Sequence, residues 1–267
     1  MQTGEDIRIL NEKIKYSSRF IETFQDELSK VIVGQQNMAH RLLIGLLSNG
    51  HVLLEGVPGL AKTLTIKSLA QAVHAKFSRI QFTPDLMPSD VLGTNIFNPG
   101  KAQFEFKHGP VFSNIVLIDE INRAPAKTQA ALFEVMEERQ VTMDGVSHKM
   151  DAPFIVMATQ NPIEQEGTYR LPEAQLDSFL FKIIVPYPNE EEETNILQRF
   201  HQFASASVID MIEPVIQASQ IMELRKAIKN ILIEEKLLQF IAKITLATRT
   251  DKAIYLGASR SEEHTSE

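Results

Sequence analysis

The sequence predicts an α/β fold in which a parallel β-sheet is flanked by helices and followed by a small helical segment. Short apolar runs alternate with segments of helical periodicity between residues 35 and 186, which is typical of βαβ units. One run, Ile115 to Ile118, is apolar at four consecutive positions, as expected for a strand buried on both faces of a parallel sheet. The predicted strands are His51–Leu54, Arg79–Phe82, Ile115–Ile118, Phe154–Ala158 and Lys182–Val185.

The composition limits the possible functions. With 267 residues, 43% of them hydrophobic, the chain can bury one large core, or one large and one small core. The net charge of −7 means that a nucleic-acid surface would need a local basic patch, and the sequence shows no basic run. The chain has no cysteine, no basic and apolar leader, and no run of about 18 apolar residues, so we expect a cytoplasmic protein that is not embedded in a membrane.

The first predicted element is an amphipathic helix near the N-terminus. Its residues Phe20, Phe24 and Leu28 share one helix face. We expect this face to pack on the sheet, with the binding of a partner protein as the alternative.

The stretch EGVPGLAKT, from Glu55 to Thr63, joins the first predicted strand to a segment of helical periodicity. It matches the phosphate-binding pattern G-x-x-x-x-G-K-[ST], except that Ala61 replaces the second glycine. In this context the backbone N–H groups and the helix N-terminus can surround phosphates, Lys62 can reach the terminal phosphates, and Thr63 can bind Mg²⁺. We expect Ala61 to have a negative φ, with its methyl group directed away from the phosphates. A tight turn with an incidental lysine is the alternative.

Polar side chains follow two further predicted strands. Asp119 and Glu120 come directly after Ile118, at the strand end where open α/β sheets bind ligands. Asp119 would hold Mg²⁺ through water, and Glu120 would polarise an attacking water. Asn161 would reach the same sheet edge, where its amide could hydrogen-bond the γ-phosphate or that water. A solvated strand end and a simple turn are the respective alternatives.

Three runs of the sequence resemble the MoxR family of AAA+ ATPases, in which alanine before the lysine is a familiar variant. They are GVPGLAKT, VLIDEINRAPAKTQAALFEVMEERQVTMDG and MATQNPIEQEGTYRLPEAQLDSF. The resemblance extends over residues 15–259 and implies a P-loop NTPase fold of the AAA+ type with a small C-terminal α-helical lid. It also implies hydrolysis of ATP with Mg²⁺, assembly into a homo-oligomeric ring, commonly a hexamer, and remodelling or maturation of client proteins. Family members often act with von Willebrand-type metal-binding proteins.

The resemblance also assigns roles to single residues. The loop would be the Walker A motif, Asp119-Glu120 the Walker B pair, and Asn161 the sensor 1 residue. Gly34, in VIVGQQ, would let the backbone bend beside the adenine, although a joint between two helices is an equal alternative. The expected nucleotide-binding residues are Gly34, Gly56, Val57, Pro58, Gly59, Leu60, Ala61, Lys62, Thr63 and Asp119. The expected catalytic residues are Lys62, Glu120, Asn161 and Arg170, and the expected Mg²⁺ ligands are Thr63 and Asp119.

Two β-hairpins are predicted outside the sheet. The stretch NIFNPGKAQFEFKHGP has a turn at Asn98 to Gly100, and QVTMDGVSHKM contains Asp144-Gly145, which favours a type I′ turn. In related rings such hairpins face the pore.

One departure from the family pattern concerns the neighbouring active site. Ser178 stands where the family usually has an arginine that stabilises charge on the γ-phosphate bound by the adjacent subunit. Arg170, in GTYRLPE, is the expected substitute. Arg123 is a second candidate, although an arginine just past a strand end is more typical of a surface or packing residue.

We expect two domains, with residues 1–188 forming the nucleotide-binding domain and residues 189–259 a partial lid. Pro186 and Pro188 mark the linker, and the acidic run from Asn189 predicts a capped helix start. The family continues after LGAS with an arginine that senses the γ-phosphate and with another helix. Here the sequence continues as RSEEHTSE, so we expect residues 260–267 to be a non-native tail and Arg260 not to be that arginine.

Two other functions stay open. A nucleic-acid-dependent ring motor is one, because replicative helicases share a hairpin before sensor 1, although the acidic charge argues against it. A nucleotide-binding assembly module with little turnover is the other, suggested by Ser178 and by the missing lid arginine.

Overall fold

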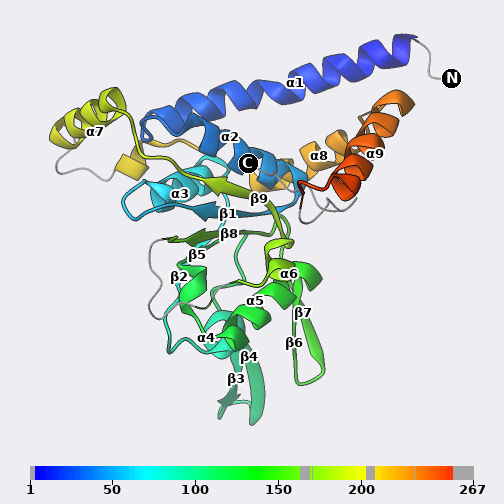
Figure 1. The fold of residues 1–267 in the computed structure, drawn as a ribbon. Helices are drawn as coiled ribbons and strands as arrows, with labels where there is room; N and C mark the ends of the chain where they lie inside the picture. Colours follow the sequence, from blue (N-terminus) through cyan, green and yellow to red (C-terminus); the bar gives the residue numbers. More distant parts are fainter. Residues whose placement is uncertain (1–3, 163–168, 170, 203–207, 232, 255–267) are drawn as a thin grey trace.

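A five-stranded parallel sheet forms the centre of the fold (Figure 1). The computed structural model describes residues 4–162, 169, 171–202, 208–231 and 233–254. In spatial order the strands are β2 (Phe77–Gln81), β5 (Ile115–Asp119), β8 (Ile155–Gln160), β1 (His51–Glu55) and β9 (Phe179–Ile184), and each adjacent pair is parallel. The predicted parallel sheet is therefore confirmed, with strand ends shifted by a few residues.

Helices cover both faces of this sheet because the strand residues alternate between two apolar clusters. Val52 and Leu54 of β1 belong to the cluster beneath α1 (Gly4–Ser29), α2 (Gln36–Ser48) and α3 (Lys62–Ala72). Leu53 belongs to the cluster on the opposite face, beneath α4 (Pro88–Leu92) and α5 (Ala126–Glu138). The predicted packing of the N-terminal helix on the sheet domain is confirmed, since Phe24 and Leu28 are buried in the first cluster.

Two antiparallel hairpins project from the sheet domain, as predicted (Figure 1). One is formed by β3 (Gly93–Asn98) and β4 (Gln103–His108), the other by β6 (Gln140–Met143) and β7 (Val146–Lys149). Asp144 and Gly145 have φ values of 50° and 80°, in agreement with the expected type I′ turn. The hairpins contact each other through the rings of Phe106 and His148, whose centroids are 4.2 Å apart.

The regular elements described after β9 are all helical. They are α7 (Glu190–Gln202), the 3₁₀ turn η2 (Val208–Met211), α8 (Ala218–Lys229) and α9 (Glu235–Thr250). One further short helix, α6 (Glu173–Leu176), lies just before β9. Asn189 and Glu192 form the predicted cap of α7, each side chain accepting the backbone N–H of the other at 2.9–3.0 Å. No helix in the described part of the chain combines the length and apolar character needed to cross a bilayer. The predicted tail, residues 260–267, lies outside the described residues.

Candidate functional site

Most of the predicted site residues meet in a cleft of about 390 Å³ at the carboxyl edge of the sheet, namely Pro58 to Thr63, Asp119, Glu120 and Asn161. The cleft is lined by the loop between β1 and α3, by the acidic pair Asp119-Glu120 at the end of β5, and by the ends of β2 and β8. Strands β1, β5 and β8 are adjacent and parallel, so their C-terminal ends deliver polar side chains to the same edge. The structure thereby brings together residues from separate parts of the sequence, namely Lys62, Thr63, Asp119, Glu120 and Asn161.

The backbone at Ala61 corrects one prediction. Its φ is 54° and its ψ is 15°, so the expected negative φ is wrong. Ala61 immediately precedes the first residue of α3, and its carbonyl oxygen accepts the backbone N–H of Thr65 at 2.8 Å. The left-handed conformation turns the chain from the loop into the helix while that carbonyl already makes a helical hydrogen bond. This conformation costs an L-residue roughly 1–2 kcal/mol and costs glycine much less.

The Lys62 ammonium lies inside the curve of the loop. It donates to the carbonyl oxygen of Gly56 and, at 2.9 Å, to that of Val57. Burial lowers the pKa of Lys62, while the charges of Asp119 and Glu120 oppose this effect. The loop therefore holds a half-buried cation at the place where the phosphate-binding pattern requires one.

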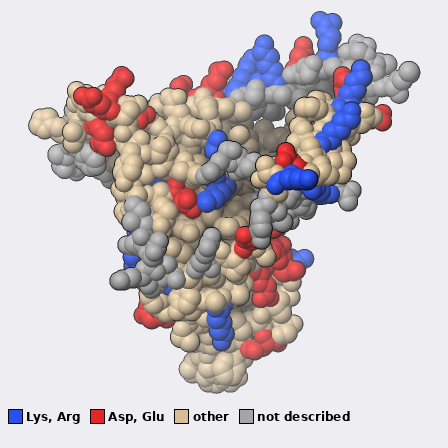
Figure 2. Space-filling model, in the orientation of Figure 1, with Lys and Arg blue, Asp and Glu red and all other residues tan. Residues whose placement is uncertain are grey.

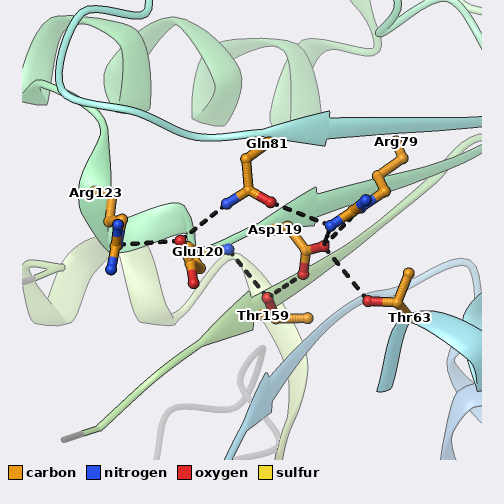
Figure 3. A network of polar contacts seen from close by, with 7 residues as sticks. All are labelled: Thr63, Arg79, Gln81, Asp119, Glu120, Arg123 and Thr159. Atoms are coloured by element: carbon orange, nitrogen blue, oxygen red, sulfur yellow. Dashed lines mark hydrogen bonds and ion pairs between the residues drawn. The ribbon is translucent and has the colours of Figure 1, made fainter. Parts of the chain in front are cut away.

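Asp119 is buried, and hydrogen bonds from neighbouring elements fix its carboxylate (Figure 3). Its Oδ1 accepts a hydrogen bond from the Thr159 hydroxyl at 2.8 Å. Its Oδ2 accepts a bond from Arg79 Nε at 2.7 Å and lies 3.4 Å from the Thr63 hydroxyl. Thr159 also accepts the backbone N–H of Glu120 at 3.0 Å, so one hydroxyl on β8 orients both members of the acidic pair.

Glu120 is held at the mouth of the cleft by two side chains of its own chain. Its Oε2 accepts a hydrogen bond from Gln81 Nε2 at 2.9 Å and lies 3.0 Å from Arg123 Nε (Figure 3). Arg123, the second candidate for completing the site of a neighbouring subunit, pairs with the acidic residue three positions earlier in this chain. Its role toward a neighbouring subunit stays a prediction.

Arg79 and Gln81 are the site residues that the sequence reasoning missed. They lie two positions apart on β2 and therefore share one face of that strand, while Ile80 between them is buried. In the parallel register Gln81 is opposite Asp119 and Arg79 is opposite Leu117, so both side chains lie beside the acidic pair (Figure 3). The alternation of polar and apolar residues in RIQF is the signal that could have indicated them.

Other predicted residues lie elsewhere. Gly34 has a φ of 64° in the joint before α2, and a Cβ there would come within 2.2 Å of Glu192 Oε1. Ser178 precedes β9 and therefore lies at the amino edge of the parallel sheet, opposite the cleft, where its hydroxyl is 3.3 Å from Glu137 Oε1. Arg170 lies outside the described residues.

Comparisons with known proteins agree with this geometry. Residues 51–181 match the model of the ATPase family associated with various cellular activities (AAA). The chain is 46% identical to Chaperone MoxR1 of Mycobacterium tuberculosis, covering 88% of this chain and 61% of that protein. It is also 46% identical to the uncharacterised protein YeaC of Bacillus subtilis, covering 88% of this chain and 72% of YeaC. The crystal structure of a candidate ATPase from Cytophaga hutchinsonii superposes with a TM-score of 0.85 at 44% identity, covering 97% of this chain and 80% of that one.

Proposed function

The chain belongs to the MoxR family of AAA+ ATPases, and from this premise we propose that it binds and hydrolyses ATP with Mg²⁺ to remodel protein clients. The observation that carries the proposal is the meeting of Lys62, Thr63, Asp119 and Glu120 in one cleft at the carboxyl edge of the sheet. A basic residue, a hydroxyl and two carboxylates in this arrangement are the groups that phosphoryl transfer requires.

The loop and the acidic pair fit a Mg²⁺–triphosphate. Lys62 would exchange its bonds to Gly56 and Val57 for bonds to phosphate oxygens. The Thr63 hydroxyl and Asp119 Oδ2 are hard oxygen donors on facing elements, which suits Mg²⁺. When bound, Mg²⁺ would neutralise the negative charge on the β- and γ-phosphate oxygens.

Glu120 and Asn161 would act on the attacking water. Gln81 and Arg123 fix the Glu120 carboxylate at the cleft mouth, where it could orient a water and accept its proton. Asn161, buried at the end of β8, would donate to the γ-phosphate or to that water. Gly34 is proposed to allow the backbone bend beside the adenine.

The helices beyond Pro188 are proposed to form the lid, with residues 1–188 as the nucleotide-binding domain. Two contacts support a lid that rests on that domain. Arg199 of α7 donates to the carbonyl oxygens of Lys30 and Ser29 at the end of α1. Arg225 of α8 donates to the carbonyl oxygen of Leu46 at the end of α2.

The assembly proposed is a homo-oligomeric ring, commonly hexameric in the family, located in the cytoplasm. The chain spans 61% of the length of MoxR1. That this chain acts on protein clients, including a von Willebrand-type metal-binding protein, is therefore part of the proposal. Arg170 is proposed to act as the cation that reaches a neighbouring subunit's γ-phosphate.

A Glu120→Gln variant tests the proposed chemistry. It keeps the shape of the side chain and removes the base, so we expect ATP binding to persist, turnover to fall by at least about 100-fold, and an ATP-bound oligomer to accumulate in native mass measurements. Glu138→Gln, an equal charge change at the exposed end of α5, should leave turnover unchanged. Continued turnover by Glu120→Gln would show that Glu120 is not the base that accepts the proton of the attacking water.

Ser178 favours a second candidate, a nucleotide-binding assembly module with little turnover. Placing arginine at this position should then raise ATP hydrolysis well above that of the natural sequence.

A nucleic-acid motor finds no comparable support. Lys and Arg side chains are scattered among acidic ones on the face seen in Figure 2, and the described residues form no continuous basic strip there.

A further inference from the structure

We propose that Arg79 is a positioning residue that competes with Mg²⁺ for Oδ2 of Asp119 and thereby sets how strongly nucleotide binding depends on Mg²⁺. This inference rests on the proposed binding of ATP and Mg²⁺ at the cleft. It extends that function because Arg79, a residue of β2, would compete with the metal for the carboxylate of Asp119.

The geometry places both partners on the same carboxylate oxygen. Arg79 Nε and Nη2 each lie 2.7 Å from Asp119 Oδ2. That oxygen also faces the Thr63 hydroxyl at 3.4 Å, so it belongs to the proposed metal site. The other oxygen, Oδ1, is bonded to Thr159 at 2.8 Å and points away from this pair (Figure 3).

Burial decides which partner can move. The Asp119 side chain is 11% exposed and is held from β8, whereas the Arg79 side chain is 53% exposed on the edge strand β2. A buried carboxylate is costly without a cation or a hydrogen bond, and the guanidinium supplies both when no metal is bound. Because a guanidinium and a Mg²⁺ ion held through water beside the same oxygen repel each other, metal binding would displace the arginine toward solvent and the phosphates.

A displaced arginine would stay near the site. Its Nη2 donates to Gln81 Oε1 at 3.2 Å, and the amide of Gln81 donates in turn to Glu120. Arg79 and Gln81 share one face of β2, so a side chain leaving Asp119 remains over the cleft. The same charge that competes with Mg²⁺ would then attract a triphosphate.

Two consequences follow for a variant without this charge. In the absence of metal, Asp119 would face the triphosphate without its cation, so metal-free nucleotide binding should weaken. In the presence of Mg²⁺, the end of the competition with the guanidinium offsets the lost attraction between Arg79 and the triphosphate, so binding should change little. The weaker metal-free binding therefore raises the ratio of the dissociation constant measured in EDTA to that measured in saturating Mg²⁺.

Equilibrium binding of a fluorescent ATP analogue measures this ratio. For Arg79→Gln we expect the ratio to rise about tenfold above that of the natural sequence. The reason is that the charge-assisted hydrogen bond from Arg79 to Asp119 is lost. Arg79→Lys, which keeps the charge, should restore much of the original ratio. Lys149→Gln, the same charge change on the exposed hairpin strand β7, should leave it unchanged.

A second measurement needs no nucleotide. Mg²⁺ alone should raise the melting temperature of Arg79→Gln more than that of the natural sequence, since the competing cation is gone. An unchanged binding ratio in Arg79→Gln, or an equal Mg²⁺-induced rise in melting temperature in both proteins, overturns the role of Arg79 while leaving ATP binding intact. Failure of the natural sequence to bind the analogue in Mg²⁺ overturns the proposed function and this inference with it.

Discussion

Replacing Ala61 with glycine should make the protein more stable. Ala61 has a φ of 54°, in the left-handed region that costs an L-residue roughly 1–2 kcal/mol. Glycine removes that cost but adds about 0.4–1 kcal/mol of conformational entropy to the unfolded chain. The net expectation is a free energy of unfolding about 1 kcal/mol higher, which corresponds to a melting temperature about 2–4 °C higher in a chain of this size.

Urea denaturation followed by circular dichroism measures the effect. Ala130→Gly is the matched control because Ala130 is exposed inside α5, where glycine should lower the free energy of unfolding by about 1 kcal/mol. The same substitution thus has opposite expected signs at the two positions. If Ala61→Gly proves as destabilising as Ala130→Gly, residue 61 has ordinary helical or extended backbone and the reasoning is refuted.

The remaining predictions concern stability outside the loop. Burial lowers the pKa of His51 from 6.5 to about 4. Between pH 4 and pH 6.5 the unfolded chain therefore binds more protons than the folded chain. The free energy of unfolding should decrease by about 2 kcal/mol when the pH is lowered from 7 to 5. His51→Gln should lose this part of the pH dependence in urea titrations, and an unaltered dependence would contradict the assignment. The Asn49 side-chain oxygen accepts bonds from both Arg139 and Arg225. Asn49→Ala should lower the free energy of unfolding by about 2–3 kcal/mol, whereas Asn37→Ala, on the exposed face of α2, should change it little; equal effects would show that the bridge contributes nothing.

One expectation failed although its residue was correctly singled out. The expected negative φ of Ala61 follows from the small size of its methyl group, but the φ is set by its place immediately before α3. For Arg123, which stays a candidate, the sequence does not indicate that the 3₁₀ turn η1 (Ile121–Arg123) directs the side chain to Glu120. In both cases residue type was known and local backbone direction was not.

The sequence by itself determined the parallel sheet, the two hairpins, the capped start of α7, and which loop and acidic pair to examine. These features depend on local properties: the periodicity of apolar side chains, turn residues such as Asp144-Gly145, and the spacing within EGVPGLAKT. Each can be read within a window of a few residues, because a helix or strand responds to its immediate neighbours.

Only the tertiary structure decided that Arg79 bonds Asp119, that Gln81 bonds Glu120, and that Thr159 orients both carboxylates. These contacts depend on the order β2-β5-β8 and on its register, which place side chains about 40 positions apart within hydrogen-bonding distance. Sheet order is fixed by how the whole apolar surface is buried between two layers of helices. No local pattern encodes it, so the partners of a predicted residue emerge only when the strands are assembled.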